Sequence, residues 1–220
     1  MKMTNQADCI TTYSGIHMNP LDPKPDDFRI EDIAHALPLI CRGNGHVKTF
    51  FSVGKHCINC AREAEALYLP DRMVLACLLH DASECYMSDV PRPFKRNLPE
   101  YREAEDHLLS VLYTKFLGSD LTDAEYRRMK QIDNAMFWYD MHELLNEDIG
   151  PKPEIHIRIS YAWRPFQEVE KEYLDIYRTR NRSMIASSTA LTKNGFISKT
   201  ERKQKRQLWS YGTRGMDAEN

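Results

Sequence analysis

The apolar run Met73–Leu79 constrains the fold of this chain more than any other segment. It follows Pro70 and Asp71, and an aspartate at that point suits the N-terminus of a helix. The run has no polar face, so we expect a central helix that other elements cover on all sides. It is also much shorter than the roughly 20 residues that cross a bilayer. The run therefore predicts a buried helix at the centre of a helical fold.

Helical spacing of apolar residues recurs on both sides of this run. It predicts further helices over residues 30–41, 52–69, 99–116, 122–146 and 165–180. Pro38 is expected to kink or shorten the first of them, and Thr122 with Glu125 has the form of a capping box. Residues 155–161 alternate apolar and polar side chains, which predicts one short strand. We expect an all-α fold.

The length of 220 residues suits one domain with flanking segments. Residues 1–29 are rich in proline and aspartate and predict an extended N-terminal arm. Residues 30–180 are expected to form the helical bundle. Residues 181–220 become polar and basic, which predicts a loosely ordered C-terminal tail.

The composition limits the kinds of partner. A formal net charge of −2 provides no global attraction to nucleic acid or to an anionic membrane, so an anionic substrate would need a local cluster or a metal ion. The first residues lack the apolar core of a signal peptide, which predicts a cytoplasmic protein without membrane contact. We interpret the six cysteines as reduced thiols. A zinc or redox role for Cys57 and Cys60 is the alternative.

Polar residues follow the central run directly. His80 and Asp81 stand at its end, and Glu84 lies one helical turn further, where all three side chains can point to one place. His56 and Asp133 join them if their helices pack against the central one. Imidazole and carboxylate ligands suit a divalent ion such as Mn, Fe, Co or Zn and leave room for water and a phosphate oxygen. Such a centre is typical of hydrolysis.

Two alternatives stay open at this point. Asp140 is two helical turns after Asp133 on nearly the same face, with His142 close by, so it competes as the fourth ligand. The consecutive aromatic residues 137–139 point in different directions on a helix. They can stack on a base or pack in the core, and core packing is expected for at least two of them.

The order of these residues resembles a known signature. His56, then His80-Asp81, then Asp133 is similar to the H…HD…D pattern of the HD-domain phosphohydrolases. Residues 80–84 and 89–95 resemble its 5'-deoxynucleotidase branch. The resemblance covers about residues 30–145 and implies a helical bundle of the HD-domain type.

The resemblance also implies roles for individual residues. It implies one divalent ion (Co, Mn, Mg, Fe or Zn) held by His56, His80, Asp81 and Asp133. Glu84 would be the catalytic acid or base. The substrate contacts it implies are Arg42, Asp89 and Lys95.

The expected function is hydrolysis of deoxyribonucleotides. Either the 5'-phosphate of a monophosphate or the triphosphate of a deoxynucleoside triphosphate such as dATP would be released, and both reactions need the same ligands. The sequence leaves open base preference and self-association into a homo-oligomer. The alternative is a regulatory or nucleic-acid-binding protein that uses the basic tail and keeps a non-catalytic metal site.

Overall fold

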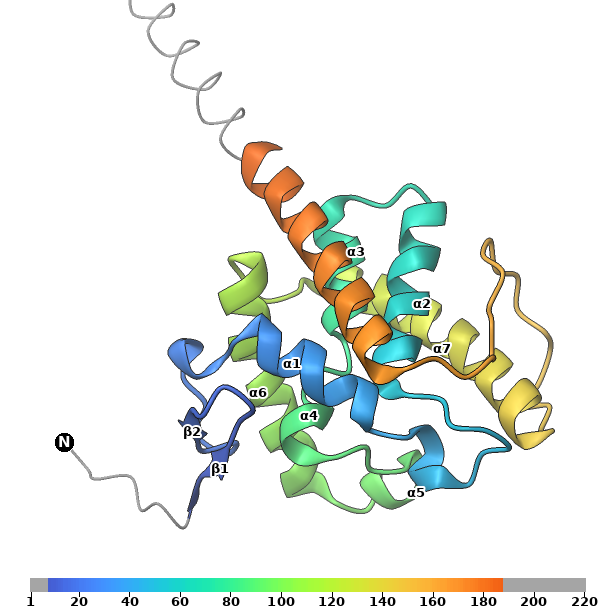
Figure 1. Cartoon of the computed structure of the whole chain (residues 1–220), viewed down its shortest axis with the longest axis horizontal. Helices are drawn as coiled ribbons and strands as arrows, with labels where there is room; N and C mark the ends of the chain where they lie inside the picture. The colour runs from blue at the N-terminus through green and yellow to red at the C-terminus, as the bar shows by residue number, and fades with distance from the viewer. Residues whose placement is uncertain (1–7, 188–220) are drawn as a thin grey trace, which may run out of the picture. The chain divides into compact units, whose positions relative to one another are not determined.

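The computed structural model describes residues 8–187 (Figure 1). The chain divides into two units, 1–180 and 181–220. Of the second unit, only residues 181–187 are described, and they are helical. The remainder of the predicted basic tail, residues 188–220, lies outside the described part of the chain. The last helix begins at residue 166 and continues through residue 187, so the prediction that it ends near Arg180 is wrong.

The described residues are mostly helical, as the sequence predicts. Short 3-10 turns, η2 (Pro25–Asp27), η3 (Leu37–Leu39) and η4 (Arg42–Gly45), separate the early elements. The α-helices that precede the last one are α1 (Ile30–Ala36), α2 (Val53–Ala66), α3 (Asp71–Leu79), α4 (Glu84–Met87), α5 (Arg92–Lys95), α6 (Pro99–Leu117) and α7 (Asp123–Leu145).

The predicted helix boundaries agree with local chemistry. Helix α1 stops before Pro38, and the chain continues as η3. The Ser52 hydroxyl caps α2 by accepting a hydrogen bond from the backbone N–H of Lys55 at 3.1 Å. Helix α7 opens with the capping box of Thr122 and Glu125. Helix α5 is a single turn that begins after Pro91 and has a proline in its first turn, where the missing N–H costs no hydrogen bond.

Helix α3 is central, as its apolar run predicts. Met73 to Leu79 are all buried, and α3 packs against α2, α6 and α7. Burial of each large apolar side chain contributes about 1.5–3 kcal/mol to stability. Helices α2 and α7 also contact each other and lie side by side in Figure 1. Helix α7 therefore packs against both α2 and α3, although it is distant from them in the sequence.

A glycine allows the close approach of α2 to η3. A Cβ atom at Gly54 would lie 2.9 Å from the backbone nitrogen of Pro38 and 3.1 Å from the carbonyl carbon of Leu37. Both neighbours are backbone atoms, which cannot rotate away. Only glycine fits at this point of α2, two residues before His56.

The N-terminal arm contains a short hairpin, a detail that the sequence did not predict within the mostly helical fold. Strands β1 (Ile10–Thr11) and β2 (His17–Met18) pair antiparallel around a turn in which Gly15 has a φ of 83°. Buried Asp32 accepts hydrogen bonds from the backbone N–H of Ser14 at 2.6 Å and from its hydroxyl at 2.8 Å. The turn chemistry and this anchor from α1 stabilise the hairpin.

The strand predicted over residues 155–161 is wrong, because these described residues form an irregular segment. Without a neighbouring strand, their backbone groups need other partners. The buried carboxylate of Glu63 accepts the backbone N–H of His156 at 2.8 Å and faces its Nδ1 atom at 2.8 Å. The ring of Tyr161 lies 5.0 Å from that of Phe51. Contacts with Glu63 of helix α2 therefore take the role that a neighbouring strand would have in a sheet.

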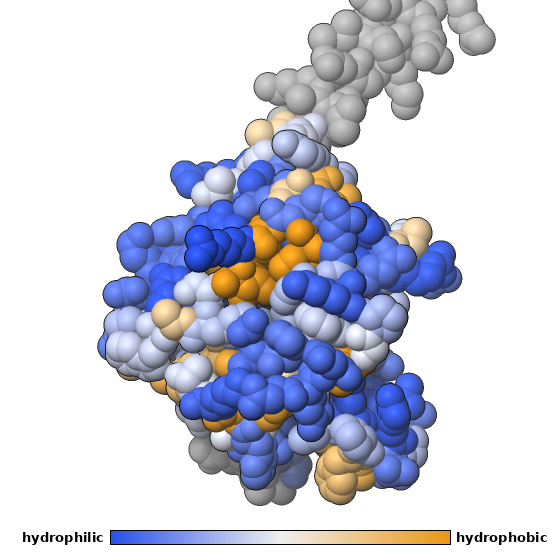
Figure 2. Space-filling view, turned by 90° about the vertical axis from the view of Figure 1, so that its right-hand side faces the viewer, coloured by the Kyte–Doolittle hydropathy of each residue, from blue (hydrophilic) through white to orange (hydrophobic). Residues whose placement is uncertain are grey.

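The surface is mixed in character. On the face drawn in Figure 2, hydrophilic residues surround a patch of apolar ones. None of the helices in the described part of the chain combines the length and apolar character needed to span a bilayer.

Candidate metal centre

Four side chains from separate helical segments meet at the end of α3. His56 comes from α2, Asp133 from α7, and His80 and Asp81 follow the last residue of α3. The Nε2 atom of His56 lies 3.2 Å from Oδ1 of Asp133, and Nε2 of His80 lies 3.1 Å from Oδ2 of Asp81. The four residues singled out in the sequence are thus brought together in space.

The spacing of these four atoms suits a single ion. Nε2 of His80 is 3.5 Å from Oδ1 of Asp133, and Nε2 of His56 is 3.9 Å from Oδ2 of Asp81. Donors that lie about 2.1 Å from one ion, at angles of 90–110° to each other, are separated by roughly 3.0–3.4 Å. The observed distances are close to this range, so one ion can contact all four side chains after small movements.

The other nitrogen of each imidazole is engaged elsewhere. Nδ1 of His80 donates to the carbonyl oxygen of Cys77 at 2.8 Å. Nδ1 of His56 lies 2.8 Å from Oδ2 of Asp140, whose other oxygen accepts the Tyr161 hydroxyl at 3.0 Å. These contacts turn both Nε2 atoms toward the carboxylates. Nε2 of His80 is buried and faces Asp81 and Asp133, the position of a ligand atom in the cluster.

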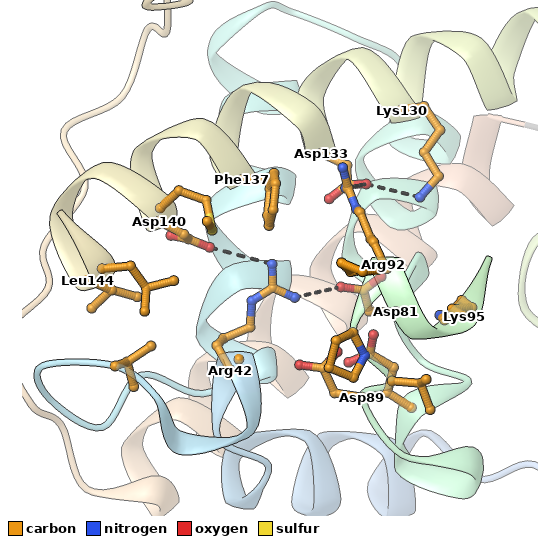
Figure 3. Close-up of a pocket in the computed structure, with 18 residues that line it drawn as sticks. Arg42, Asp81, Asp89, Arg92, Lys95, Lys130, Asp133, Phe137, Asp140 and Leu144 are labelled. Carbon is orange, nitrogen blue, oxygen red and sulfur yellow. Dashed lines mark hydrogen bonds and ion pairs between the residues drawn. The ribbon is translucent and has the colours of Figure 1, made fainter. Parts of the chain in front are cut away.

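Arginine and lysine side chains contact the carboxylates of the cluster. Arg42 reaches from η4 to within 3.3 Å of Asp81 and 3.6 Å of Asp140 (Figure 3). Its position follows from the backbone, since the Arg42 N–H donates to the Phe51 carbonyl at 2.8 Å beside the start of α2. On the other side, Lys130 donates to Oδ2 of Asp133 at 2.9 Å, one helical turn before it on α7. The cluster is therefore a compact network of opposite charges.

The charges change the pKa values of the candidate ligands. Burial disfavours the ionised form of Asp133, but hydrogen bonds from His56 and His80 outweigh it and lower the pKa of this carboxyl well below its usual range. Burial also opposes protonation of His80, but Asp81 overcomes this and raises the pKa of the imidazole well above its usual value. Without an ion, protons on the imidazoles would balance the carboxylates. A metal ion would take the place of those protons.

Glu84 lies at the cluster, but it is joined to α3 by a turn and not by the continuous helix that the sequence predicts. Helix α3 ends at Leu79, and a tight turn leads to α4, where Glu84 is the first residue. His80 and Ser83, at the two ends of this turn, keep helical φ and ψ angles. Burial, with added repulsion from Asp81 and Asp89, raises the pKa of Glu84 well above its usual value. Its Oε2 atom is buried without a partner among the described residues.

A cavity of about 330 Å³ opens in front of the cluster. Such a volume suits a small-molecule ligand. Asp81 and Asp133 line it, whereas His56 and His80 are buried and do not. Lys95, another lining residue, contacts both oxygens of Glu105, at 2.8 and 2.9 Å. The lining residues that the sequence had singled out are Arg42, Asp81, Glu84, Asp89, Lys95 and Asp133.

Comparison with known proteins places the chain in a family. No protein-family model matches it. Over 140 residues it is 37% identical to the uncharacterized protein YfdR of Escherichia coli K12, an alignment that covers 59% of this chain and 76% of YfdR. The chain belongs to the YfdR family. An uncharacterized protein of Rhodobacter capsulatus is also 37% identical over 109 residues, which are 47% of this chain and 55% of that relative.

The structure of this YfdR-family chain brings three further residues to the site. Lys130 lines the cavity, and its signal in the sequence was its position one turn before Asp133. Arg92 also lines the cavity, where it lies 3.3 Å from Asp133 and 4.2 Å from the ring centre of Phe137. Asp140 contacts Nδ1 of His56, so it lies on the opposite side of the imidazole from Asp133.

The three consecutive aromatic residues 137–139 of this YfdR-family chain differ in what they contact. Buried Trp138 donates to the carbonyl oxygen of Gly150 at 2.9 Å, and the Tyr139 hydroxyl donates to that of Pro153 at 3.0 Å. These two residues hold the loop after α7. Phe137 alone of the three lines the cavity of the metal centre.

Cysteine sulfur atoms lie close to the two histidines of this YfdR-family chain. Its six cysteines are free, in agreement with the interpretation as reduced thiols. His56, Cys60 and His80 offer ligand atoms that all lie within 4.8 Å of one another, as do Cys57, His80 and Asp81. The described residues therefore include buried groups that could hold a metal ion. The thiol-containing sets and the carboxylate-containing set share the same histidines.

Proposed function

We propose that this protein is a metal-dependent phosphohydrolase of the HD-domain type and that its substrates are deoxyribonucleotides. The observation that carries the proposal is the convergence of two imidazole nitrogens and two carboxylate oxygens, 3.1–3.9 Å apart, beside a cavity that the two carboxylates line. The order of these residues in the sequence, which resembles the HD-domain signature, supports the same conclusion.

The charges of the cavity support a requirement for metal. Its lining includes five acidic side chains and four basic ones, so the protein alone offers a phosphate no net attraction. A divalent ion would reverse this balance and leave the basic groups free to pair with phosphate. The basic side chains are Arg42, Arg92, Lys95 and Lys130.

The remaining lining is apolar and suits a nucleoside. A deoxyribose and a base present flat apolar surfaces, and Phe137 offers an aromatic ring for stacking. Asp89 provides an acceptor for a sugar hydroxyl at the same cavity. The apolar lining residues on the α7 side are Phe137, Met141, Leu144 and Leu145.

Hydrolysis would form a bond between a water oxygen and phosphorus and break the bond from phosphorus to the 5'-oxygen. A divalent ion held by the four ligands would supply a Lewis acid for water and for a phosphoryl oxygen. Arg42 and Lys95 would stabilise the charge that develops on the phosphoryl group. Glu84, whose pKa burial raises, would in its protonated form donate its proton to the departing 5'-oxygen and recover one from the water.

The same residues serve two reactions. In a monophosphate the water attacks the single phosphorus, and in a triphosphate it attacks the phosphorus bonded to the 5'-oxygen and releases triphosphate. The proposal therefore covers both, and product analysis distinguishes them: orthophosphate indicates a nucleotidase and triphosphate indicates a triphosphohydrolase.

The test is a screen of the purified protein with deoxynucleoside mono- and triphosphates. Each substrate is combined with Mn²⁺, Co²⁺, Mg²⁺, Fe²⁺ or Zn²⁺ and assayed for orthophosphate and triphosphate. We expect activity that His80→Ala abolishes. His142→Ala is the matched control, because this half-exposed histidine on α7 lies outside the cluster. No turnover with any combination, or full activity in His80→Ala, would refute the proposed function.

A further inference from the structure

We propose that His56 and His80 also belong to a second metal-binding mode, in which Cys60 replaces the carboxylates and the preferred ion is thiophilic. The Sγ atom of Cys60 lies 3.6 Å from Nε2 of His56, and the ligand atoms of all three residues lie within 4.8 Å of one another. All three side chains are buried, with exposed fractions of 0–3%. Binding in this mode is independent of the proposed hydrolysis.

The distance between sulfur and nitrogen matches a zinc site. With Zn–S bonds of about 2.3 Å and Zn–N bonds of about 2.05 Å, a tetrahedral angle places the two donors about 3.5 Å apart. The 3.6 Å between Cys60 and His56 is close to this value. Three protein ligands with a fourth position left for another donor is a common arrangement for zinc.

The backbone explains why the sulfur meets both imidazoles. His56 and Cys60 are four residues apart on α2, so their side chains lie on one face of the helix. The carbonyl oxygen of Cys77 accepts a hydrogen bond from Nδ1 of His80 and so directs the Nε2 atom of that ring toward the cluster. His80 therefore presents Nε2 as a ligand atom to the same space as the thiol.

The ligand types separate the two modes by chemistry. Carboxylate oxygens favour Mg²⁺ and Mn²⁺, whereas a thiolate with two imidazoles favours Zn²⁺ and Cd²⁺. On binding, the Cys60 thiol and the two imidazoles release their protons to the solvent, and the thiolate and both Nε2 atoms coordinate the ion. Each Nε2 atom has one lone pair, so an ion bound through Cys60 withdraws both imidazoles from Asp81 and Asp133. A thiophilic ion therefore competes with the ion of the carboxylate mode, and its inhibitory effect on hydrolysis rests on the proposed function.

The experiment is a titration of the metal-free, full-length protein with Co²⁺, monitored by absorption. Thiolate bound to Co²⁺ produces a charge-transfer band in the near ultraviolet, which imidazole and carboxylate ligands do not produce. We expect this band in the wild-type protein and its loss in Cys60→Ala. It should persist in Cys77→Ala, the matched removal of another buried thiol.

A second measurement needs no variant. The wild-type protein is loaded with ¹¹³Cd²⁺, and its NMR resonance is expected far downfield of that of cadmium bound by nitrogen and oxygen alone. Absence of the Co²⁺ band and of the downfield resonance overturns the inference. So does a band that survives in a folded Cys60→Ala variant or that is lost only in Cys57→Ala, which would identify the other thiol. Nucleotide hydrolysis enters neither readout, so failure of the proposed function is recognised separately.

Discussion

The Nδ1 atom of His56 lies 2.8 Å from Oδ2 of Asp140, and both side chains are buried. The Tyr161 hydroxyl donates to the other oxygen of Asp140 at 3.0 Å, which fixes the carboxylate in place. A carboxylate behind a ligating imidazole selects the tautomer, orients the ring and raises the basicity of the nitrogen that faces the metal. Asp140 therefore acts on the candidate centre through His56.

Replacing Asp140 should weaken metal binding without removing a ligand. We expect Asp140→Ala to lower the affinity for Mn²⁺ by about 10–100-fold, the usual effect of losing such a partner. Isothermal titration calorimetry measures it. Asp148→Ala is the control, since Asp148 pairs with His142 in an exposed position away from the cavity. Equal affinities for the two variants would show that Asp140 has no such role.

The metal-free protein should lose stability as the pH rises above 6.5. The pKa values of His56 and His80 are raised above their ordinary value of 6.5, because nearby acidic groups outweigh the opposing effect of burial. The folded state then holds protons that the unfolded chain has already released, so the free energy of unfolding falls with rising pH. The raised pKa of Glu84 acts in the same direction above 4.5.

Thermal unfolding from pH 6 to pH 9, with EDTA and with Mn²⁺, checks this prediction. The melting temperature in EDTA should decline across the range, and Mn²⁺ should reduce the decline because the ion replaces the protons. A melting temperature in EDTA that rises between pH 6.5 and pH 8 would contradict it.

Gly54→Ala should destabilise the fold. The added Cβ would meet the backbone of Leu37 and Pro38 at 2.9–3.1 Å, which forces α2 and η3 apart and costs about 1–3 kcal/mol. Urea denaturation gives the change in free energy of unfolding. Arg62→Ala, on the exposed face of the same helix, should change it by less than about 0.5 kcal/mol. A Gly54→Ala protein of unchanged stability would mean that the two elements separate at no cost.

Asp32→Ala should release the N-terminal hairpin from α1. The variant loses two hydrogen bonds from Ser14 and leaves a backbone N–H without its partner, at a cost of about 1–3 kcal/mol. Ser14→Ala removes only the hydroxyl bond and should cost about 0.5–1.5 kcal/mol. Urea denaturation ranks the two variants, and limited proteolysis should show earlier cleavage near the hairpin in Asp32→Ala. If the free energy of unfolding fell less in Asp32→Ala than in Ser14→Ala, Asp32 would not be the anchor of the hairpin.

Much of the helical fold was predictable, because helices follow from local spacing. The apolar run of α3, the Ser52 cap of α2 and the capping box of α7 each rest on residues within one or two turns. The hairpin at residues 10–18 was missed because strands of two residues leave no periodic pattern. The strand predicted at 155–161 failed for the opposite reason: its alternation was present, but no second strand lies beside it.

The sequence by itself determined which side chains are available: a buried helix followed by His80 and Asp81, with a histidine before it and an aspartate after it. Only the tertiary structure decided that His56 and Asp133, 77 residues apart, lie within 3.2 Å. The tertiary structure also decided that Asp140 faces the far nitrogen of His56, that Lys130 neutralises Asp133, and that Cys60 shares the histidines. The physical reason is that local periodicity specifies the face of a helix, whereas the contact of one face with another depends on how α2, α3 and α7 pack.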